Sequence, residues 1–265
     1  MKKRILIIGG TGTIGQRMLE RWSTLHQLTI VSRDNHKKSW LSSMYPSAKF
    51  VLCDIENIHS VRELFLDKDI IIHAAAIKNV DVGQADVEEL IRVNISGTQR
   101  VAEMFERYAT GVGIFLSSDK AVQPTNTYGY SKAVGEAICR QAGMKVLRYG
   151  NVVGSQGSFI PIWKRAIAEG KPIVARDATR FFLTVDQAIS LISDAVGTEG
   201  ELFIPRNLKG FSIVPLARYI AGDNVEIKSL TPGEKQHEQL LSVSEVAIRA
   251  NEPLSQVEWG VNTEV

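Results

Sequence analysis

The sequence predicts an α/β protein: a Rossmann-type, doubly wound parallel sheet with a small C-terminal lobe. Short β-rich runs alternate with longer amphipathic stretches over the first two-thirds of the chain. Several of these runs are continuously apolar, as in strands buried on both faces, and a glycine-rich turn follows the first. After about Val153, Gly and Pro become frequent. We therefore expect residues 1–153 to form the Rossmann domain and 154–265 a smaller lobe interleaved with it.

The predicted strands and helices follow in chain order. The strands of the sheet are Arg4–Ile8, Leu28–Ser32, Phe50–Cys53, Asp69–His73, Gly113–Leu116 and Lys145–Arg148. The helices are Ile14–Thr24, Val87–Tyr108 and Tyr128–Ala142. The lobe receives three short strands, Lys171–Val174, Leu202–Ile204 and Val225–Ile227, and Pro161–Glu169 packs either there or on the main sheet.

Composition excludes several classes of protein. The chain has 265 residues, which suits one large domain or a core domain with a lobe. A formal net charge of +2 gives no electrostatic reason to expect nucleic acid. Cys53 and Cys139 lie far apart and match no metal-ligand spacing, so we expect no metal and a reducing compartment.

The N-terminal apolar run is a strand in this interpretation. Ile5–Ile8 is too short for a signal peptide and breaks at Gly9. No apolar stretch approaches the roughly 20 residues of a membrane helix. We expect a cytoplasmic protein that does not enter the membrane.

The first turn predicts a dinucleotide site. Gly9, Gly12 and Gly15 stand at G-x-x-G-x-x-G spacing between the first strand and a helix that begins near Thr13 and Ile14. Glycine lets the backbone turn tightly and approach a pyrophosphate, and a helix N-terminus attracts the phosphates. A purely structural turn is the alternative; the context favours dinucleotide binding.

The end of the second strand bears on which dinucleotide binds. Ser32 and Arg33 end this strand, and Lys37 follows closely. A guanidinium there suits the 2′-phosphate of NADP, whereas an acidic residue suits the ribose of NAD. Asp34 leaves NAD open as the alternative, and we expect NADP. Asp54, after the third strand, is expected near the adenine, together with Ile55.

The segment "SSDKAVQPTNTYGYSK", from Ser117 to Lys132, has the composition of a catalytic site. Tyr128 and Lys132 are four residues apart on a predicted helix, so they share a face. The ammonium can lower the phenol pKa from about 10 and help it remove a hydroxyl proton. The adjacent Asp119 and Lys120 supply an acid-base pair, unless they form an exposed ion pair of no consequence.

Here the chain resembles a known family. The motifs "GGTGTIG", "HAAA", "SSDKA-x-x-P-x-N-x-YG-x-SK" and "RYGNVVGS" are similar to those of extended short-chain dehydrogenases/reductases. "HAAAIKNV", "TRFFLT" and "PGEKQHE" resemble the inverting UDP-N-acetylglucosamine 4,6-dehydratases of polysaccharide biosynthesis. The resemblance covers nearly the whole chain. It departs at Thr231, where relatives have Arg, and in the short C-terminal lobe.

The resemblance implies a role for each catalytic residue. Tyr128 helps oxidise the sugar C4 hydroxyl, with Lys132 beside it. Lys120 removes the C5 proton that the 4-ketone acidifies, and Asp119 protonates the departing C6 hydroxyl. Hydride then returns to C6, so no net oxidation occurs, and Lys in place of Glu implies inversion at C5.

The resemblance also implies the binding residues. The further cofactor contacts are Ala74, Ala75, Ala76, Asn94 and Ser117, and the substrate contacts are Lys78, Asn151, Arg180 and Glu234. His73 is expected to be a packed histidine. The long helices Val87–Tyr108 and Tyr128–Ala142 are expected to join subunits in a dimer or larger homo-oligomer.

Two other functions stay open. A nucleotide-sugar 4-epimerase or reductase would keep Tyr128 and Lys132 without needing the Asp119–Lys120 pair. A non-catalytic NADP sensor would tolerate loss of the Tyr-x-x-x-Lys pair, which is intact here.

Overall fold

The computed structural model describes residues 2–78, 86–155, 158–206 and 208–245. Its centre is a seven-stranded sheet in the order β10-β6-β5-β4-β1-β2-β3, in which every neighbouring pair is parallel. The strands are β1 Arg4–Ile8, β2 Gln27–Ser32, β3 Lys49–Leu52, β4 Ile70–His73, β5 Val112–Leu116, β6 Lys145–Leu147 and β10 Leu202–Phe203. This is the doubly wound sheet that the sequence predicts.

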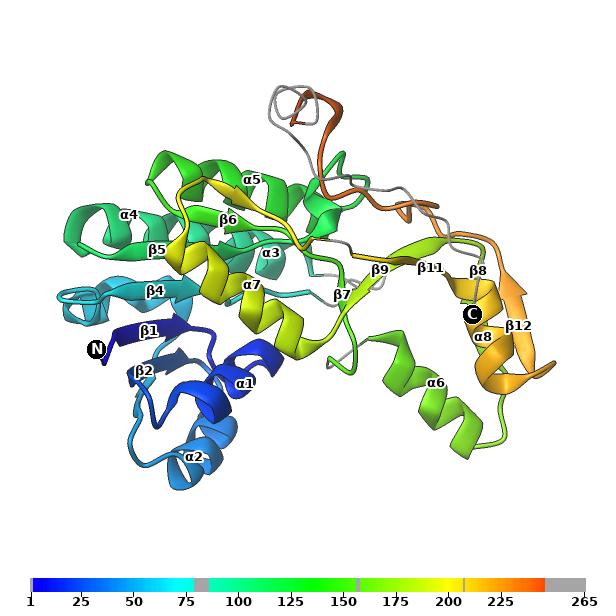
Figure 1. Cartoon of the computed structure of the whole chain (residues 1–265), viewed down its shortest axis with the longest axis horizontal. Helices are drawn as coiled ribbons and strands as arrows, with labels where there is room; N and C mark the ends of the chain where they lie inside the picture. Colours follow the sequence, from blue (N-terminus) through cyan, green and yellow to red (C-terminus); the bar gives the residue numbers. More distant parts are fainter. Residues whose placement is uncertain (1, 79–85, 156–157, 207, 246–265) are drawn as a thin grey trace.

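Helices cover both faces of the sheet (Figure 1). One face carries α1 Thr13–Trp22, α2 Asn35–Met44 and α7 Val185–Gly197. The other carries the 3-10 helix η1 Ile55–Leu64, α3 Val87–Leu90, the π-helical η2 Ile91–Gly97, α4 Thr98–Tyr108 and α5 Thr127–Gln141. Ile5 and Ile7 of β1 pack toward the first face, and Leu6 and Ile8 pack toward the second. Continuous apolar strands therefore build two cores.

The smaller lobe lies beside the carboxyl end of the sheet (Figure 1). It contains β7 Asn151–Val152, α6 Phe159–Ala168, β8 Ile173–Arg176, β9 Thr179–Leu183, β11 Gly210–Ser212, α8 Ile213–Ala221 and β12 Val225–Lys228. Two small sheets, β11-β9-β7 and β12-β8, frame a core around Trp163 and Ile173. Pro161–Glu169 falls largely within α6, which packs here and not on the main sheet.

One predicted strand belongs elsewhere. Leu202–Ile204 was assigned to the lobe, but Leu202 and Phe203 pair in parallel with Val146 and Leu147 and extend the main sheet. Helix α7, also from the C-terminal part of the chain, packs its apolar face on the same sheet. The chain thus returns from the lobe to complete the main sheet.

A segment that we call the C-terminal strap, Thr231–Glu245, runs back from the lobe toward α5 (Figure 1). It is largely irregular, and its Leu240 and Leu241 are buried. Glu245 binds Arg148 beyond β6, which fixes the end of the strap on the main domain. Among the residues that the structure describes, no helix combines the length and apolar character that crossing a bilayer requires.

Candidate active site

The glycine-rich turn packs against the loop that follows β4. Gly9 has φ +84, and a Cβ there would lie 2.5 Å from the main-chain nitrogen of Ala75. Gly12 differs, since a Cβ would meet only the carbonyl oxygen of Gly9, at 3.5 Å. The protein itself therefore needs glycine at position 9, whereas at position 12 glycine keeps open space in front of α1.

The N-terminus of α1 suits an anion. Gly12 is its N-cap residue and supplies no side-chain cap, and no acidic residue lies in the first turn. Thr13 begins the helix, Ile14 packs its side chain on the cores, and Gly15 lies against the main chain of Gly10. A helix N-terminus of this kind presents main-chain N–H groups and a partial positive charge to a phosphate.

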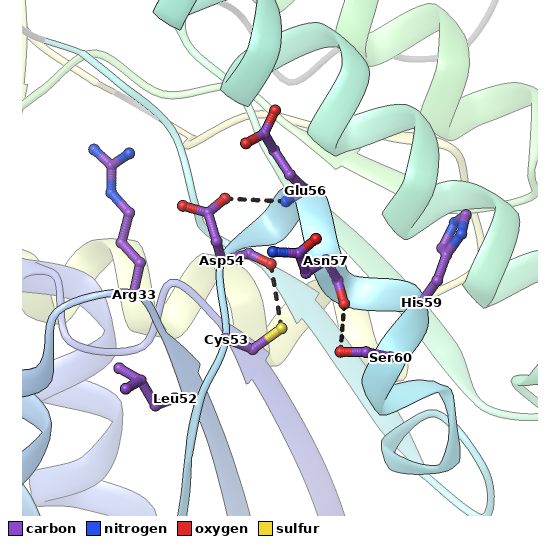
Figure 2. Close-up of a pocket in the computed structure, with 8 residues that line it drawn as sticks. All are labelled: Arg33, Leu52, Cys53, Asp54, Glu56, Asn57, His59 and Ser60. Atoms are coloured by element: carbon purple, nitrogen blue, oxygen red, sulfur yellow. Dashed lines mark hydrogen bonds between the residues drawn. The ribbon is translucent and has the colours of Figure 1, made fainter.

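An open pocket of about 600 Å³ lies at the ends of β2 and β3 (Figure 2). Arg33 and Asp54 line it from the two strand ends. The Arg33 guanidinium is half exposed and pairs with Glu89 at 3.0 Å. Ile55, expected at the cofactor, has its side chain buried against Gly97.

Two carboxylates near this pocket are engaged with the main chain. Asp34 caps α2 by accepting a 2.9 Å hydrogen bond from the Lys37 N–H, which lowers the pKa of Asp34. Its carboxylate also lies 3.6 Å from the Lys37 ammonium. Asp54 caps η1 through the Glu56 N–H at 3.0 Å. Ser32 is buried and bonds the Thr11 hydroxyl at 2.7 Å, which ties the first turn to β2.

The loop after β4 is held from the other side by Asn94. This buried amide exchanges two hydrogen bonds with the main chain of Ile77, at 2.8 and 2.9 Å, and donates to Ser131 at 3.0 Å. Asn94 lies in the π-helical η2, an element frequent at functional sites. It therefore positions Ala74–Lys78 relative to α5. Ala74 and Ala75 pass beside the glycine turn, and Ala76 is exposed.

Asp119 and Lys120 form a short 3-10 turn, η3 Asp119–Ala121, directly beyond β5. Asp119 is fully buried; its Oδ1 accepts from Ser118 at 2.9 Å and from the Lys120 ammonium at 3.1 Å. Its Oδ2 has no protein partner among the described residues. A buried carboxylate oxygen without a partner is costly, which is typical of a group that a substrate completes.

Lys120 is an ammonium in this arrangement. Burial lowers its pKa, but the carboxylates of Asp119 and Glu238 outweigh burial, so the pKa is raised overall. Lys120 is thus charged at neutral pH.

Tyr128 begins α5, which Asn126 caps through the Gly129 N–H at 2.8 Å. The pKa of its phenol is raised overall: burial and the Asp119 carboxylate raise it, and these outweigh the Lys120 ammonium and a hydrogen bond with Ser118, which lower it. Tyr149 adjoins this phenol, and its own pKa is raised by burial.

Lys132 acts differently from the prediction. Its ammonium donates to the carbonyl of Leu116 at 2.6 Å and lies 4.1 Å from the centre of the Phe115 ring. Burial lowers its pKa to about 8. The cation that acts on the phenol pKa of Tyr128 is Lys120. Helical spacing places Lys132 on the same face as Tyr128, but tertiary contacts decide where its ammonium lies.

The Ser117 hydroxyl bonds a buried carboxylate. Its hydroxyl donates to buried Glu136 at 2.5 Å, and Glu136 pairs with Arg148 at 2.6 Å. The predicted cofactor residue is therefore a member of a buried ion-pair network beneath α5. Ser118, which the sequence analysis did not select, supplies the hydroxyl next to Tyr128. The doubled serine of "SSDK" contained this signal.

The predicted substrate residues have partners in the lobe and the strap. Asn151 donates to the Phe181 carbonyl at 3.2 Å, and Arg180 donates to the Lys235 carbonyl at 2.9 Å. Glu234 pairs with Arg176 at 3.2 Å. Lys78 is the last described residue before 79–85, so the rest of "HAAAIKNV" lies outside the described part of the chain. His73 is fully buried and bonds Thr98, as a packed histidine does.

The chain has the fold and site of the extended short-chain dehydrogenases/reductases. These features are a parallel sheet, a glycine turn that leaves space for a pyrophosphate, and a Tyr-x-x-x-Lys helix beside an acid-base pair. Residues 5–256 match the polysaccharide biosynthesis protein family, and the chain belongs to this family.

Similar proteins carry two enzyme names. The chain is 32% identical over 262 residues to the UDP-N-acetylglucosamine 4,6-dehydratase (inverting) of Campylobacter jejuni subsp. jejuni serotype O:2, covering 91% of this chain and 78% of that one. It is 31% identical over 271 residues to the UDP-glucose 4-epimerase of Rickettsia bellii, covering 92% and 79%.

Solved structures share the fold. Pen from Bacillus thuringiensis has a TM-score of 0.81 at 29% identity, covering 91% of this chain and 84% of that one. DesIV, a dTDP-glucose 4,6-dehydratase from Streptomyces venezuelae solved with NAD, has a TM-score of 0.79 at 18% identity, covering 93% and 90%.

Proposed function

We propose that the protein is a nucleotide-sugar 4,6-dehydratase that acts on UDP-N-acetylglucosamine and inverts C5. The observation that carries the proposal is the Asp119–Lys120 pair beside Tyr128, with the buried, unpartnered Oδ2 of Asp119. Elimination of water between C5 and C6 needs a base and an acid close together, which this pair supplies. The similarity to an inverting dehydratase supports the substrate and the stereochemistry.

The chain offers a fitting cradle for a nicotinamide dinucleotide, which when bound supplies the hydride acceptor and donor. Gly12 and the N-terminus of α1 would hold its pyrophosphate, because the space before Gly12 is open and the helix has no side-chain cap. The pocket between Arg33 and Asp54 would hold the adenosine end.

The pair must exchange a proton before it can act. The raised pKa of Lys120 makes it an ammonium, whereas removal of the C5 proton needs the neutral amine. Transfer of one proton from Lys120 Nζ to Asp119 Oδ1, over 3.1 Å, turns the amine into the base and the carboxyl into the acid. The amine then takes the C5 proton, and the carboxyl protonates the departing C6 hydroxyl. Before this elimination, Tyr128 would give up its own proton to solvent and, as a phenolate, accept the proton of the C4 hydroxyl.

NADP is the dinucleotide that we propose. Asp34, the acidic residue that would favour NAD, is engaged as the N-cap of α2, and Arg33 lines the pocket with a half-exposed guanidinium that pairs with Glu89. DesIV, by contrast, was solved with NAD. Direct titration with both dinucleotides decides between them.

A 4-epimerase is the second candidate, favoured by the similarity to UDP-glucose 4-epimerase. It would use Tyr128, but its reaction would not need the Asp119–Lys120 acid-base pair. The test is incubation with UDP-N-acetylglucosamine in D₂O, followed by NMR. A new C6 methyl group with deuterium at C5 supports the dehydratase; a C4 epimer that keeps its C6 hydroxyl overturns it.

We also propose a cytoplasmic homo-oligomer. Two neighbouring helices expose large apolar side chains, Tyr130 and Val134 on α5 and Val87 on α3. Pairing of these faces between two copies would remove them from water. Analytical ultracentrifugation that finds only monomer at micromolar concentration would contradict the dimer.

A further inference from the structure

Glu238 reaches the acid-base pair from the opposite end of the chain. It is 5% exposed, and its Oε1 lies 3.7 Å from the Lys120 ammonium. Its Oε2 accepts a hydrogen bond from the Lys235 ammonium at 3.0 Å. Four charges therefore alternate in sign, in the order Asp119, Lys120, Glu238 and Lys235.

The strap holds Glu238 in this place through contacts on both sides. Lys235 donates to the carbonyl of Val122, just after the η3 turn, at 2.7 Å. Upstream, the carbonyl of Gly233 accepts from Asn126 at 2.9 Å. Downstream, Glu245 pairs with Arg148 at 2.7 Å. The carboxylate of Glu238 is thus fixed against the catalytic turn.

The other groups that face Lys120 are few. Asp119 comes from its own turn and Tyr128 from α5, and the strap contributes Glu238. Lys235 faces Glu238 and partly balances its charge. Of the two carboxylates paired with Lys120, Asp119 lies within the Ser117–Lys132 segment and Glu238 lies outside it.

We propose that Glu238 is a positioning residue that fixes the Lys120 ammonium between two carboxylates and thereby sets when Lys120 gives up its proton. The role in catalysis rests on the dehydratase function proposed above; the electrostatic relation does not. Glu238 acts through Lys120, because its two carboxylate oxygens are already engaged with lysines. It holds Lys120 at the distance from Asp119 that direct proton transfer needs.

The test compares two neighbouring variants that change charge in opposite directions. Glu238→Gln removes a negative charge near Lys120, and Lys235→Gln removes the positive charge that offsets it. Lysines labelled with ¹³C at Cε are titrated by NMR, and the Lys120 resonance is assigned with Lys120→Arg. The Lys120 titration is expected to move to lower pH in Glu238→Gln and to higher pH in Lys235→Gln.

Opposite shifts separate this proposal from simple loosening of the strap. A detached strap would remove Glu238 in both variants, so both titrations would fall together, and that result overturns the proposal. An unchanged Lys120 titration in Glu238→Gln overturns it as well. Should Glu238→Gln fail to fold by circular dichroism, Lys235→Gln decides alone: an upward shift supports the proposal and any other result contradicts it.

A second measurement connects Glu238 to catalysis. The pH profile of deuterium exchange at C5 is recorded for wild type and Glu238→Gln, and its limb should move in the direction of the NMR titration. NMR shifts as expected without C5 exchange in wild type would reject the dehydratase but keep the electrostatic role. Exchange in both proteins with the limb unmoved would reject the role of Glu238 and keep the dehydratase.

Discussion

The side-chain amide of Asn126 donates a 2.9 Å hydrogen bond to the carbonyl of Gly233, a residue 107 positions later in the chain. The same side chain caps α5 through its Oδ1, so one residue sets both the start of the helix that carries Tyr128 and the course of the strap. Asn126 consequently connects the start of α5 to the strap.

Asn126→Ala should lower stability more than Thr125→Ala. Loss of an N-cap costs about 1 kcal/mol of unfolding free energy. Thr125 donates to the same Gly233 carbonyl at 2.8 Å but caps no helix, and its bond is exposed. Urea unfolding of both variants measures the difference; equal losses would contradict a capping role for Asn126.

Gly9→Ala and Gly12→Ala should fail in different ways. Gly9 has a left-handed conformation, and a Cβ there would contact Ala75. We therefore expect Gly9→Ala to lower the unfolding free energy by more than about 1 kcal/mol. At Gly12 the chain has room, so stability should hold while dinucleotide affinity falls at least tenfold. Thermal unfolding and fluorescence titration measure the two effects. Unchanged dinucleotide affinity in Gly12→Ala would contradict a pyrophosphate site at the N-terminus of α1.

Arg33→Ala should separate the two dinucleotides. Loss of the guanidinium removes the group that would grip a 2′-phosphate, so NADP affinity should drop about tenfold or more while NAD affinity changes little. Calorimetric titration with both dinucleotides checks this. Equal losses for NADP and NAD would show that Arg33 does not read the 2′-phosphate.

Part of this architecture follows directly from the sequence. Strand β1 has the predicted bounds, since the apolar run Ile5–Ile8 is too short for a signal peptide and breaks at Gly9. The helix predicted over Val87–Tyr108 is continuous, but its π-helical turn was not foreseen, because Asn94 is fixed by Ile77 and Ser131 from outside the helix.

Side chains that depend on distant partners escaped the sequence analysis. "SSDK" and "YGYSK" predicted which residues matter, yet the sequence does not tell that Ser117 turns to Glu136 while Ser118 serves Tyr128. Glu238 is part of the motif "PGEKQHE", but its position beside Lys120 follows from the path of the strap, which the sequence does not show.

Acid should release the end of the strap. The pKa of Glu245 falls to about 2: burial would raise it, but hydrogen bonds from Arg148 and the Ser242 N–H outweigh burial. A depressed carboxyl pKa stabilises the fold above the unfolded value of about 4.3, and this contribution, up to about 3 kcal/mol, is lost as pH falls toward 2. Glu245→Gln should therefore flatten the pH dependence of unfolding between these values. An unchanged slope would contradict the ion pair.

The most direct test of the central claim follows the hydrogen at C4. UDP-N-acetylglucosamine carrying deuterium at C4 is turned over by the purified protein, and the product is read by NMR. A dehydratase that returns the hydride internally predicts deuterium in the new C6 methyl group. Deuterium that stays at C4 of an epimer would contradict the account.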